Sequence, residues 1–245
     1  MRDQLKVIGF ATAVCLVCSV LLAFIASALK ERQEANKSND IKMKVLSVFG
    51  EEVTDNKGRL KITSDELQEQ FKAKISGIVL DGHGNIVTNI LVDKIESEDM
   101  NNRDKETGLK KYYPLYKYTD SDSGSIRYAI HVSGKGLWST IKGYMALEPD
   151  LDCIAGLIFY EHQETPGLGG EIEKDYFLTR FTGKRMCRDG KPVNFRILKA
   201  GAGVSDDAAV DGISGATMTC RGVSEFLNSD YEVYNRYFEK KGLRN

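Results

Sequence analysis

Residues 211–220, with the sequence DGISGATMTC, place three hydroxyl side chains and two glycines beside a single carboxylate, with no histidine or lysine. The residues that follow predict one or two amphipathic helices, because apolar side chains recur there at helical spacing. These side chains belong to Val223, Phe226, Leu227, Tyr234, Tyr237 and Phe238. A hydroxyl just before a helix either caps the helix or carries a ligand, and the residues alone leave both interpretations open.

Two further segments are rich in glycine: GKGLWS at residues 134–139 and ETPGLGGE at residues 164–171. Each one ends a predicted strand or precedes a predicted helix. Glycine lets the backbone come close to a ligand and leaves N–H groups accessible, which favours a binding role. Trp138, the only tryptophan of the chain, would cover a flat heterocycle in such a site. The alternative is that the glycines only form turns and Trp138 packs in the core.

Residues 45–245 predict one domain of the α+β class. The alternation of apolar and polar residues over 126–132 predicts a half-buried strand. Residues 75–91 predict a hairpin, because two apolar runs flank a turn rich in glycine. Residues 153–162 predict a further strand, and helical spacing recurs over 171–181.

The N-terminal part of the chain carries an uncharged run over residues 7–29. At about 1.5 Å per residue, a helix of this length spans a hydrocarbon core of roughly 30 Å. A signal peptide cut after Ala28 is the alternative, but its apolar region is typically about 7–15 residues long, so we expect a retained anchor. Positive residues flank the run on both sides and indicate its orientation only weakly. We expect residues 1–6 as a cytoplasmic N-terminus and residues 30–44 as a charged helical or flexible stalk.

The bulk composition gives no sign of nucleic-acid binding, since the formal net charge is only −1. The five cysteines lack the spacing of a zinc site or a disulfide framework, and we expect no metal. Neither a nucleophile–base pair nor a Walker loop is recognisable, so we expect no catalytic residue. The residues alone therefore indicate a membrane-anchored α+β domain with a site suited to a flat, phosphate-bearing ligand.

The segment DGISGAT resembles the D-G-x-[ST]-G-A-T signature at which a flavin transferase attaches FMN to threonine through a phosphoester bond. GLWS and ETPGLGGE resemble the other two signatures of the same FMN-binding domain. With one N-terminal membrane helix, the chain closely resembles the family formed by the C subunits of the sodium-translocating NADH:quinone oxidoreductases (Nqr). The G subunit of the related Rnf ferredoxin:NAD oxidoreductase complex shares the domain and is the nearest alternative. A membrane-anchored FMN-binding sensor or assembly protein is a third.

The resemblance implies that Thr217, rather than Thr219, carries the covalent FMN. Gly215 and Ala216 remove side-chain bulk beside the acceptor. If a helix begins near Ala216 or Thr217, its free N–H groups favour the phosphate charge, and Ser214 is then a candidate N-cap. The first residue of the segment, an aspartate, is either read by the transferase or shapes the turn.

The resemblance also implies further contacts with the flavin, from two segments on opposite sides of the ring. These residues are Gly136, Leu137 and Trp138 on one side and Glu164, Thr165, Leu168 and Gly169 on the other. The implied role is an electron relay within a translocase, without catalysis by this protein alone. The redox chemistry belongs to the cofactor, which accepts single electrons.

The same resemblance places the protein in the bacterial inner membrane as a single-pass protein, with its main domain on the periplasmic side. Electrons arrive from an iron–sulfur centre held by the membrane subunits and leave to FMN on the B subunit. Sodium transport and quinone reduction take place elsewhere in the complex. The expected partners are the A, B, D, E and F subunits, the flavin transferase during maturation and membrane lipid, with no nucleic acid.

Overall fold

The computed structural model describes residues 2–55, 60–121 and 123–244. Residues 1, 56–59, 122 and 245, which belong to the predicted N-terminal segment and domain, lie outside the described residues. The chain divides into two compact units, Met1–Ile41 and Lys42–Asn245.

Helix α1 (Arg2–Val48) forms the first unit, and its last residues, 42–48, are the first residues of the second unit. Its stretch Lys6–Lys30 is long and apolar enough to cross a membrane, by length and composition, and its side chains are exposed. A signal sequence would satisfy the same criterion, so the retained anchor stays a prediction. The predicted stalk, residues 30–44, is helical throughout.

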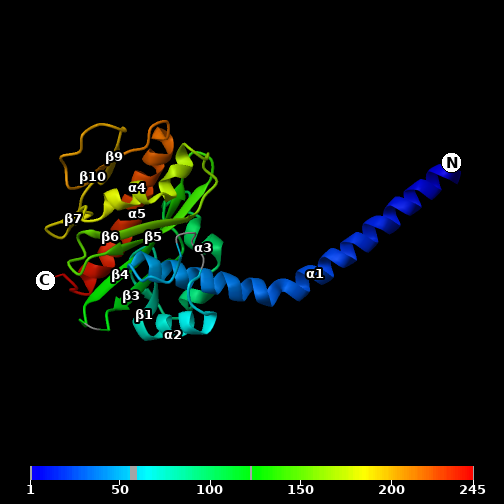
Figure 1. Cartoon of the computed structure of the whole chain (residues 1–245), viewed down its shortest axis with the longest axis horizontal. Coiled ribbons are helices and arrows are strands. Elements are labelled where there is room, and N and C mark those ends of the chain that lie inside the picture. The colour runs from blue at the N-terminus through cyan, green and yellow to red at the C-terminus, as the bar shows by residue number, and fades with distance from the viewer. Residues whose placement is uncertain (1, 56–59, 122, 245) are drawn as a thin grey trace. The chain divides into compact units, whose positions relative to one another are not determined.

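The second unit is built on a six-stranded sheet in which every neighbouring pair of strands is antiparallel (Figure 1). The strand order is β2-β1-β3-β4-β5-β6. The strands are β1 (Ile75–Leu80), β2 (Ile86–Val87), β3 (Tyr113–Thr119), β4 (Ile126–Lys135), β5 (Thr140–Leu147) and β6 (Ile154–Glu161). The predicted hairpin is the β1–β2 pair, and Gly84 has the positive φ, +76°, that its turn requires.

One long helix, α5 (Thr217–Lys240), packs against β4 at the centre of the sheet (Figure 1). Every apolar residue from which the amphipathic helix was predicted is buried. Helix and strand approach closely because Gly134 has no side chain, and a Cβ atom there would collide with Phe226. The structure thus resolves the choice between one and two helices in favour of one.

The residue that directly follows α1 and helix α2 (Ser64–Lys74) supply side chains to the other face of the sheet. Phe49 stacks on Tyr118 with 4.7 Å between ring centroids, and Phe71 meets Tyr116 edge-on at 6.3 Å. Residues 128–134 of β4 are all buried, so the strand is covered on both faces and the prediction of a half-buried strand is wrong. His131, on the face predicted to be polar, is fully buried, and its Nε2 lies 2.9 Å from the hydroxyl oxygen of Tyr160.

The remaining elements are short. Helical spacing over 171–181 is realised as three short pieces rather than one helix, and β9 and β10 form the one parallel pair among the described strands. These elements are η1 (Val92–Lys94), α3 (Ser97–Asn101), η2 (Gly169–Glu173), α4 (Asp175–Leu178), η3 (Thr179–Phe181), β7 (Cys187–Arg188), β8 (Lys191–Pro192), β9 (Arg196–Leu198) and β10 (Ala209–Asp211). The α+β class is confirmed.

A buried ionic cluster fixes the middle of α5. The carboxylate of Asp230, which is inaccessible to solvent, accepts hydrogen bonds from Arg103 and Lys110, both at 2.7 Å, and from the backbone N–H of Ser133 at 2.9 Å. Burial lowers the pKa of Lys110 to about 8, although Asp230 favours the charged form. The cluster joins α5 to β4 and to the loop before β3, and thereby sets the position of the helix on the sheet.

Candidate functional site

The three glycine-rich segments meet where α5 begins, and the carboxylate of Glu164 joins them. Its Oε1 accepts hydrogen bonds from the backbone N–H groups of Trp138 (2.9 Å) and Ser139 (3.3 Å). Its Oε2 accepts from the N–H of Leu137 (3.3 Å) and from the hydroxyl of Thr219 (2.6 Å). Glu164 is only 4% exposed. We call this arrangement the Glu164 clasp.

Three glycines make these close contacts sterically feasible. A Cβ atom on Gly136 would lie 2.5 Å from Oε1 of Glu164, and one on Gly169 would lie 2.6 Å from Oγ1 of Thr219. Gly215 has a φ of +76°, which a residue with a side chain rarely adopts, and a Cβ there would also crowd a leucine of the neighbouring loop. Packing among the segments themselves therefore accounts for these glycines.

The hydroxyl groups of the segment 211–220 lie in different environments. Thr217 is the first residue of α5 and is exposed, whereas Thr219 is 1% exposed and its hydroxyl is bonded to the clasp. The N-cap position is occupied by Ala216, without a side-chain capping bond, so the prediction that Ser214 caps the helix is wrong. Gly215 and Ala216 separate Ser214 from the first helical residue, which moves the serine out of the capping position.

Large apolar side chains are exposed on the segments that meet here. Trp138 is 71% exposed, Met218 54%, Leu137 46% and Leu168 45%. We call these four residues the apolar rim. A core position for Trp138 is thereby excluded. Apolar side chains that gather on a surface are typical of binding sites rather than of ordinary exposed positions.

A hollow of about 500 Å³ is lined in part by the loop that carries Ser214. Its lining includes Gly167, Tyr176, Arg180 and Gly201, together with Ser214 itself. This volume is within the range of about 300–1,000 Å³ that small-molecule sites usually occupy.

Two polar side chains hold the backbone that leads into this loop. Nη1 of Arg180 donates to the carbonyl oxygens of Asp211 (2.8 Å) and Gly212 (3.0 Å). The carboxylate of Asp211 accepts from the N–H groups of Gly201 and Ala202, both at 3.0 Å. In the structure, Asp211 therefore shapes the turn.

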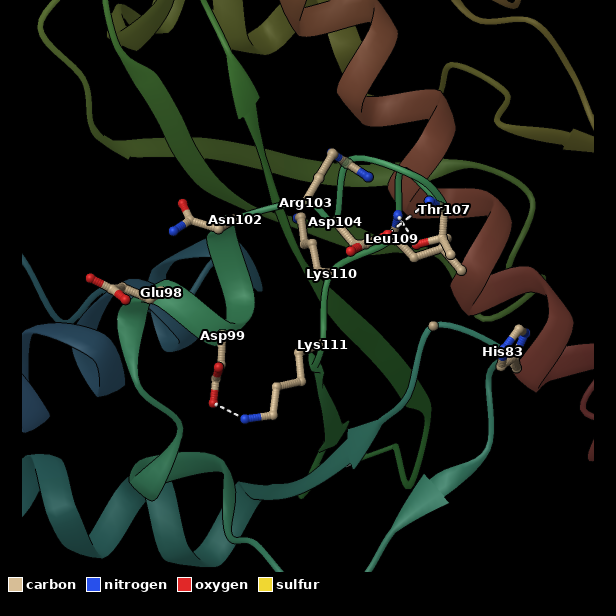
Figure 2. A pocket seen from close by; sticks show the side chains of 11 residues that line it. His83, Glu98, Asp99, Asn102, Arg103, Asp104, Thr107, Leu109, Lys110 and Lys111 are labelled. Atoms are coloured by element: carbon tan, nitrogen blue, oxygen red, sulfur yellow. Dashed lines mark hydrogen bonds and ion pairs between the residues drawn. The ribbon is translucent and has the colours of Figure 1, made fainter.

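A second hollow, of about 470 Å³, lies between α3 and the loop that precedes β3 (Figure 2). Its charged residues largely pair with one another or with Asp230 of the buried ionic cluster. Figure 2 shows Lys111 pointing toward Asp99, at 2.9 Å, and Arg103 is bonded to Asp230. Its lining residues come from 82–111, outside the glycine-rich segments.

Among the described residues there is no cluster of three or more His, Cys, Asp or Glu side chains that could hold a metal ion. All five cysteines are free thiols. Cys220 is buried on the first turns of α5, and burial raises the pKa of its thiol.

Sequence reasoning found the segments of the site but not all of their roles. The structure brings Gly136, Glu164 and Gly169 together. Thr165 is exposed, and its backbone carbonyl closes the turn that follows by accepting hydrogen bonds from the N–H groups of Leu168 and Gly170. The structure adds Arg180 to the site, although this residue belongs to none of the three glycine-rich segments. It also adds the exposed side chain of Met218, whose place between two threonines at a helix start was the only available signal.

The Glu164 carboxylate predicts a specific acid sensitivity. Burial alone raises the pKa of Glu164, but the bonds from Thr219 and from the N–H groups of Trp138, Ser139 and Leu137 outweigh it, and the pKa is lowered from 4.5. The stabilisation is therefore fully present above about pH 4.5 and is lost as the pH falls through the lower folded value. We expect Glu164→Gln to remove this part of the pH dependence in urea unfolding of the full chain in detergent.

The matched control for this measurement is Glu161→Gln, three residues earlier, where the side chain is 60% exposed and pairs with Lys142. Subtracting its profile removes the contribution of other carboxyl groups. An equal loss of acid sensitivity in both variants would show that the Glu164 bonds do not depend on ionisation.

Known proteins resemble this chain over most of its length. The FMN-binding domain family matches residues 136–232. The C subunit of the Na(+)-translocating NADH-quinone reductase from Neisseria meningitidis serogroup B is 35% identical over 219 residues, covering 86% of this chain and 83% of that protein. The protein of the same name from Yersinia pestis is 30% identical over 236 residues, covering 91% and 86%.

Two solved structures share the fold. The crystal structure of the Na(+)-translocating NADH-quinone reductase C subunit from Parabacteroides distasonis has a TM-score of 0.68 and 26% sequence identity, covering 85% of this chain and 96% of that chain. The crystal structure of Shewanella oneidensis NqrC has a TM-score of 0.69 at 24% identity, covering 85% and 99%.

Proposed function

This chain belongs to the C-subunit family of the Na(+)-translocating NADH-quinone reductases, and from that premise we propose that it is the FMN-carrying electron-relay subunit of such a complex. The observation that carries the proposal is the exposed hydroxyl of Thr217 at the start of α5, inside a matched FMN-binding domain. The relatives described above favour this role over the G subunit of Rnf and over a sensor or assembly protein.

The surroundings of Thr217 fit a covalently attached FMN. The first N–H groups of a helix have no partner within the helix, and the positive end of its dipole favours the negative charge of a phosphodiester. The N-cap residue Ala216 forms no side-chain capping bond, so no such bond competes with a ligand for the first N–H groups of α5. The alternative acceptor Thr219 is buried, and its hydroxyl already donates to Glu164.

The apolar rim and the hollow beside Ser214 fit the rest of the cofactor. An isoalloxazine ring is flat and largely apolar, and an exposed indole such as that of Trp138 stacks well on such a ring. Leu137, Leu168 and Met218 supply further exposed apolar side chains on the same glycine-rich segments. When bound, the flavin supplies one-electron chemistry, while the residues of this chain orient it and limit its contact with solvent.

The membrane arrangement forms part of the proposal. Residues 1–6 are cytoplasmic, residues 7–29 span the inner membrane once, residues 30–44 form a stalk, and residues 45–245 form the periplasmic domain. Subunits of the A, B, D, E and F type bind it in the assembled complex, and a flavin transferase loads it. The apolar stretch Lys6–Lys30 supports the anchor.

The test is an intact mass measurement on the protein purified from its native membrane in a mild detergent. We expect the mass of the polypeptide plus one FMN in phosphoester linkage, and co-purification with several membrane proteins. The same chain made in a host without flavin transferase should have the unmodified mass. Native protein that purifies alone and lacks the added mass would refute the proposal.

A further inference from the structure

We propose that Glu164, as a carboxylate, is a positioning residue that fixes the loop bearing Leu137 and Trp138 to the first turns of α5. It thereby sets where the apolar rim stands relative to Thr217. The identity of the group at Thr217 rests on the proposed function, whereas the positioning role is argued from this chain alone.

The loop side of the clasp depends on Glu164 for its backbone bonds. Residues 136–139 form the tight connection between β4 and β5, closed by the bond from the N–H of Gly136 to the carbonyl of Ser139 at 2.8 Å. The next three N–H groups along the loop converge on one carboxylate. Successive N–H groups that converge in this way form an anion-binding concavity, and here the anion is a side chain of the protein.

Side-chain packing holds this loop only weakly. The indole of Trp138 is 71% exposed and Leu137 is 46% exposed, so neither is buried deeply enough to anchor the loop. The bonds to Glu164 carry a full charge on the acceptor, and such bonds are shorter and stronger than neutral ones. The position of Trp138 therefore depends mainly on its backbone N–H.

The helix side of the clasp is fixed to the same carboxylate. Thr219 donates to Oε2 of Glu164 at 2.6 Å from a position two residues after Thr217. One turn later, Gly222 allows α5 to touch the backbone of the loop, because a Cβ atom there would collide with the carbonyl of Lys135. The carboxylate thus bridges the Trp138 loop and the helix start that carries Thr217.

The charge of Glu164 is balanced by dipoles rather than by a counter-ion. Within the described part of the chain, no lysine or arginine forms an ion pair with it, and its partners are three amides and a hydroxyl. These donors hold the pKa of Glu164 below its ordinary value despite burial. A glutamine at this position keeps one acceptor oxygen but loses the charge and places an NH2 donor where the second carboxylate oxygen accepts, which makes it an informative replacement.

Trp138 provides the readout, because it is the only tryptophan in the chain. The first experiment uses the full chain in detergent, made without flavin transferase, and measures tryptophan anisotropy and acrylamide quenching. We expect Glu164→Gln to lower the anisotropy and to raise the quenching constant. Glu161→Gln, at the exposed end of β6, should leave both unchanged.

Thr219 variants separate positioning from general destabilisation. Thr219→Val removes one donor and should shift the Trp138 signals toward those of Glu164→Gln, whereas Thr219→Ser keeps the hydroxyl and should restore them. If Glu164→Gln does not fold, the two Thr219 variants decide the question. Wild-type Trp138 signals in both Glu164→Gln and Thr219→Val would overturn the proposal.

The flavin-loaded protein gives a second readout. Trp138→Leu should change flavin emission in the wild-type background and have little further effect when Glu164→Gln is already present, because the loop is then displaced. Fully additive effects would contradict a positioning role. If the wild-type chain carries no flavin, the proposed function fails, while the anisotropy of the unloaded protein still tests the clasp.

Discussion

Thr217→Ala is expected to abolish covalent flavin attachment while the domain stays folded. The phosphoester needs the threonine hydroxyl, and alanine at the exposed first position of α5 leaves the packing of the helix unchanged. Thr217 is the first helical residue and not the N-cap, so the change to alanine should cost little stability while it removes all covalent flavin. The measurement is in-gel flavin fluorescence after denaturing electrophoresis of protein co-expressed with the flavin transferase.

Variants at the neighbouring hydroxyls are the controls. Ser214→Ala should keep the fluorescent band, since Ser214 is exposed and does not cap the helix. Thr219→Ala should also keep it, although the Glu164 clasp loses one bond. A fluorescent band from folded Thr217→Ala, or a peptide map that places the FMN mass on Thr219, would refute the assignment.

Asp230→Ala should lower the free energy of unfolding by about 3–5 kcal/mol, the usual cost of removing one partner from a buried ion pair. The variant leaves the ammonium group of Lys110 fully buried without its counter-ion and removes the acceptor for the Ser133 N–H. Because a domain is typically stable by only about 5–15 kcal/mol, this loss is a large share of the total. Urea unfolding followed by circular dichroism measures it.

A surface pair on the same helix is the matched control. Glu225→Ala breaks an exposed bond to Arg221 and should cost no more than about 0.5 kcal/mol. The double variant Asp230→Leu with Lys110→Met should recover part of the lost stability, since apolar side chains replace the two fully buried charges, while Arg103 and the Ser133 N–H still lack their acceptor. If Asp230→Ala is no less stable than Glu225→Ala, the cluster contributes nothing measurable.

The elements that sequence reasoning predicted well have regular patterns of their own. The hairpin at 75–91 shows two apolar runs around a glycine turn, and α5 repeats its apolar residues at helical spacing. The burial of β4 was predicted wrongly, because the alternation of apolar and polar residues indicates a strand but does not show what packs on each of its faces. Ala129 and His131 looked like solvent-facing residues, but both are fully buried, and His131 packs against the rings of Tyr144 and Tyr160.

The site was predicted in part for a similar reason. The order of three signatures identified which segments meet, but not which hydroxyl is buried or that Glu164 turns toward backbone N–H groups. Asp230 was not predicted at all, because its partner Lys110 lies 120 residues away and the charged stretch around Arg103 reads as a solvated loop. Long-range pairing of this kind leaves no local pattern to read.

The position of α5 in the chain fixes an order of events during synthesis. Every strand of the large sheet precedes it, so the ribosome makes these strands before the helix that covers them. Until α5 has emerged, β4 lacks its apolar cover and Glu164 lacks the Thr219 hydroxyl. Because domains fold as units during and after translation, the proposed attachment of FMN to Thr217 in the folded domain has to wait until the helix that it begins has been translated and has packed onto the sheet.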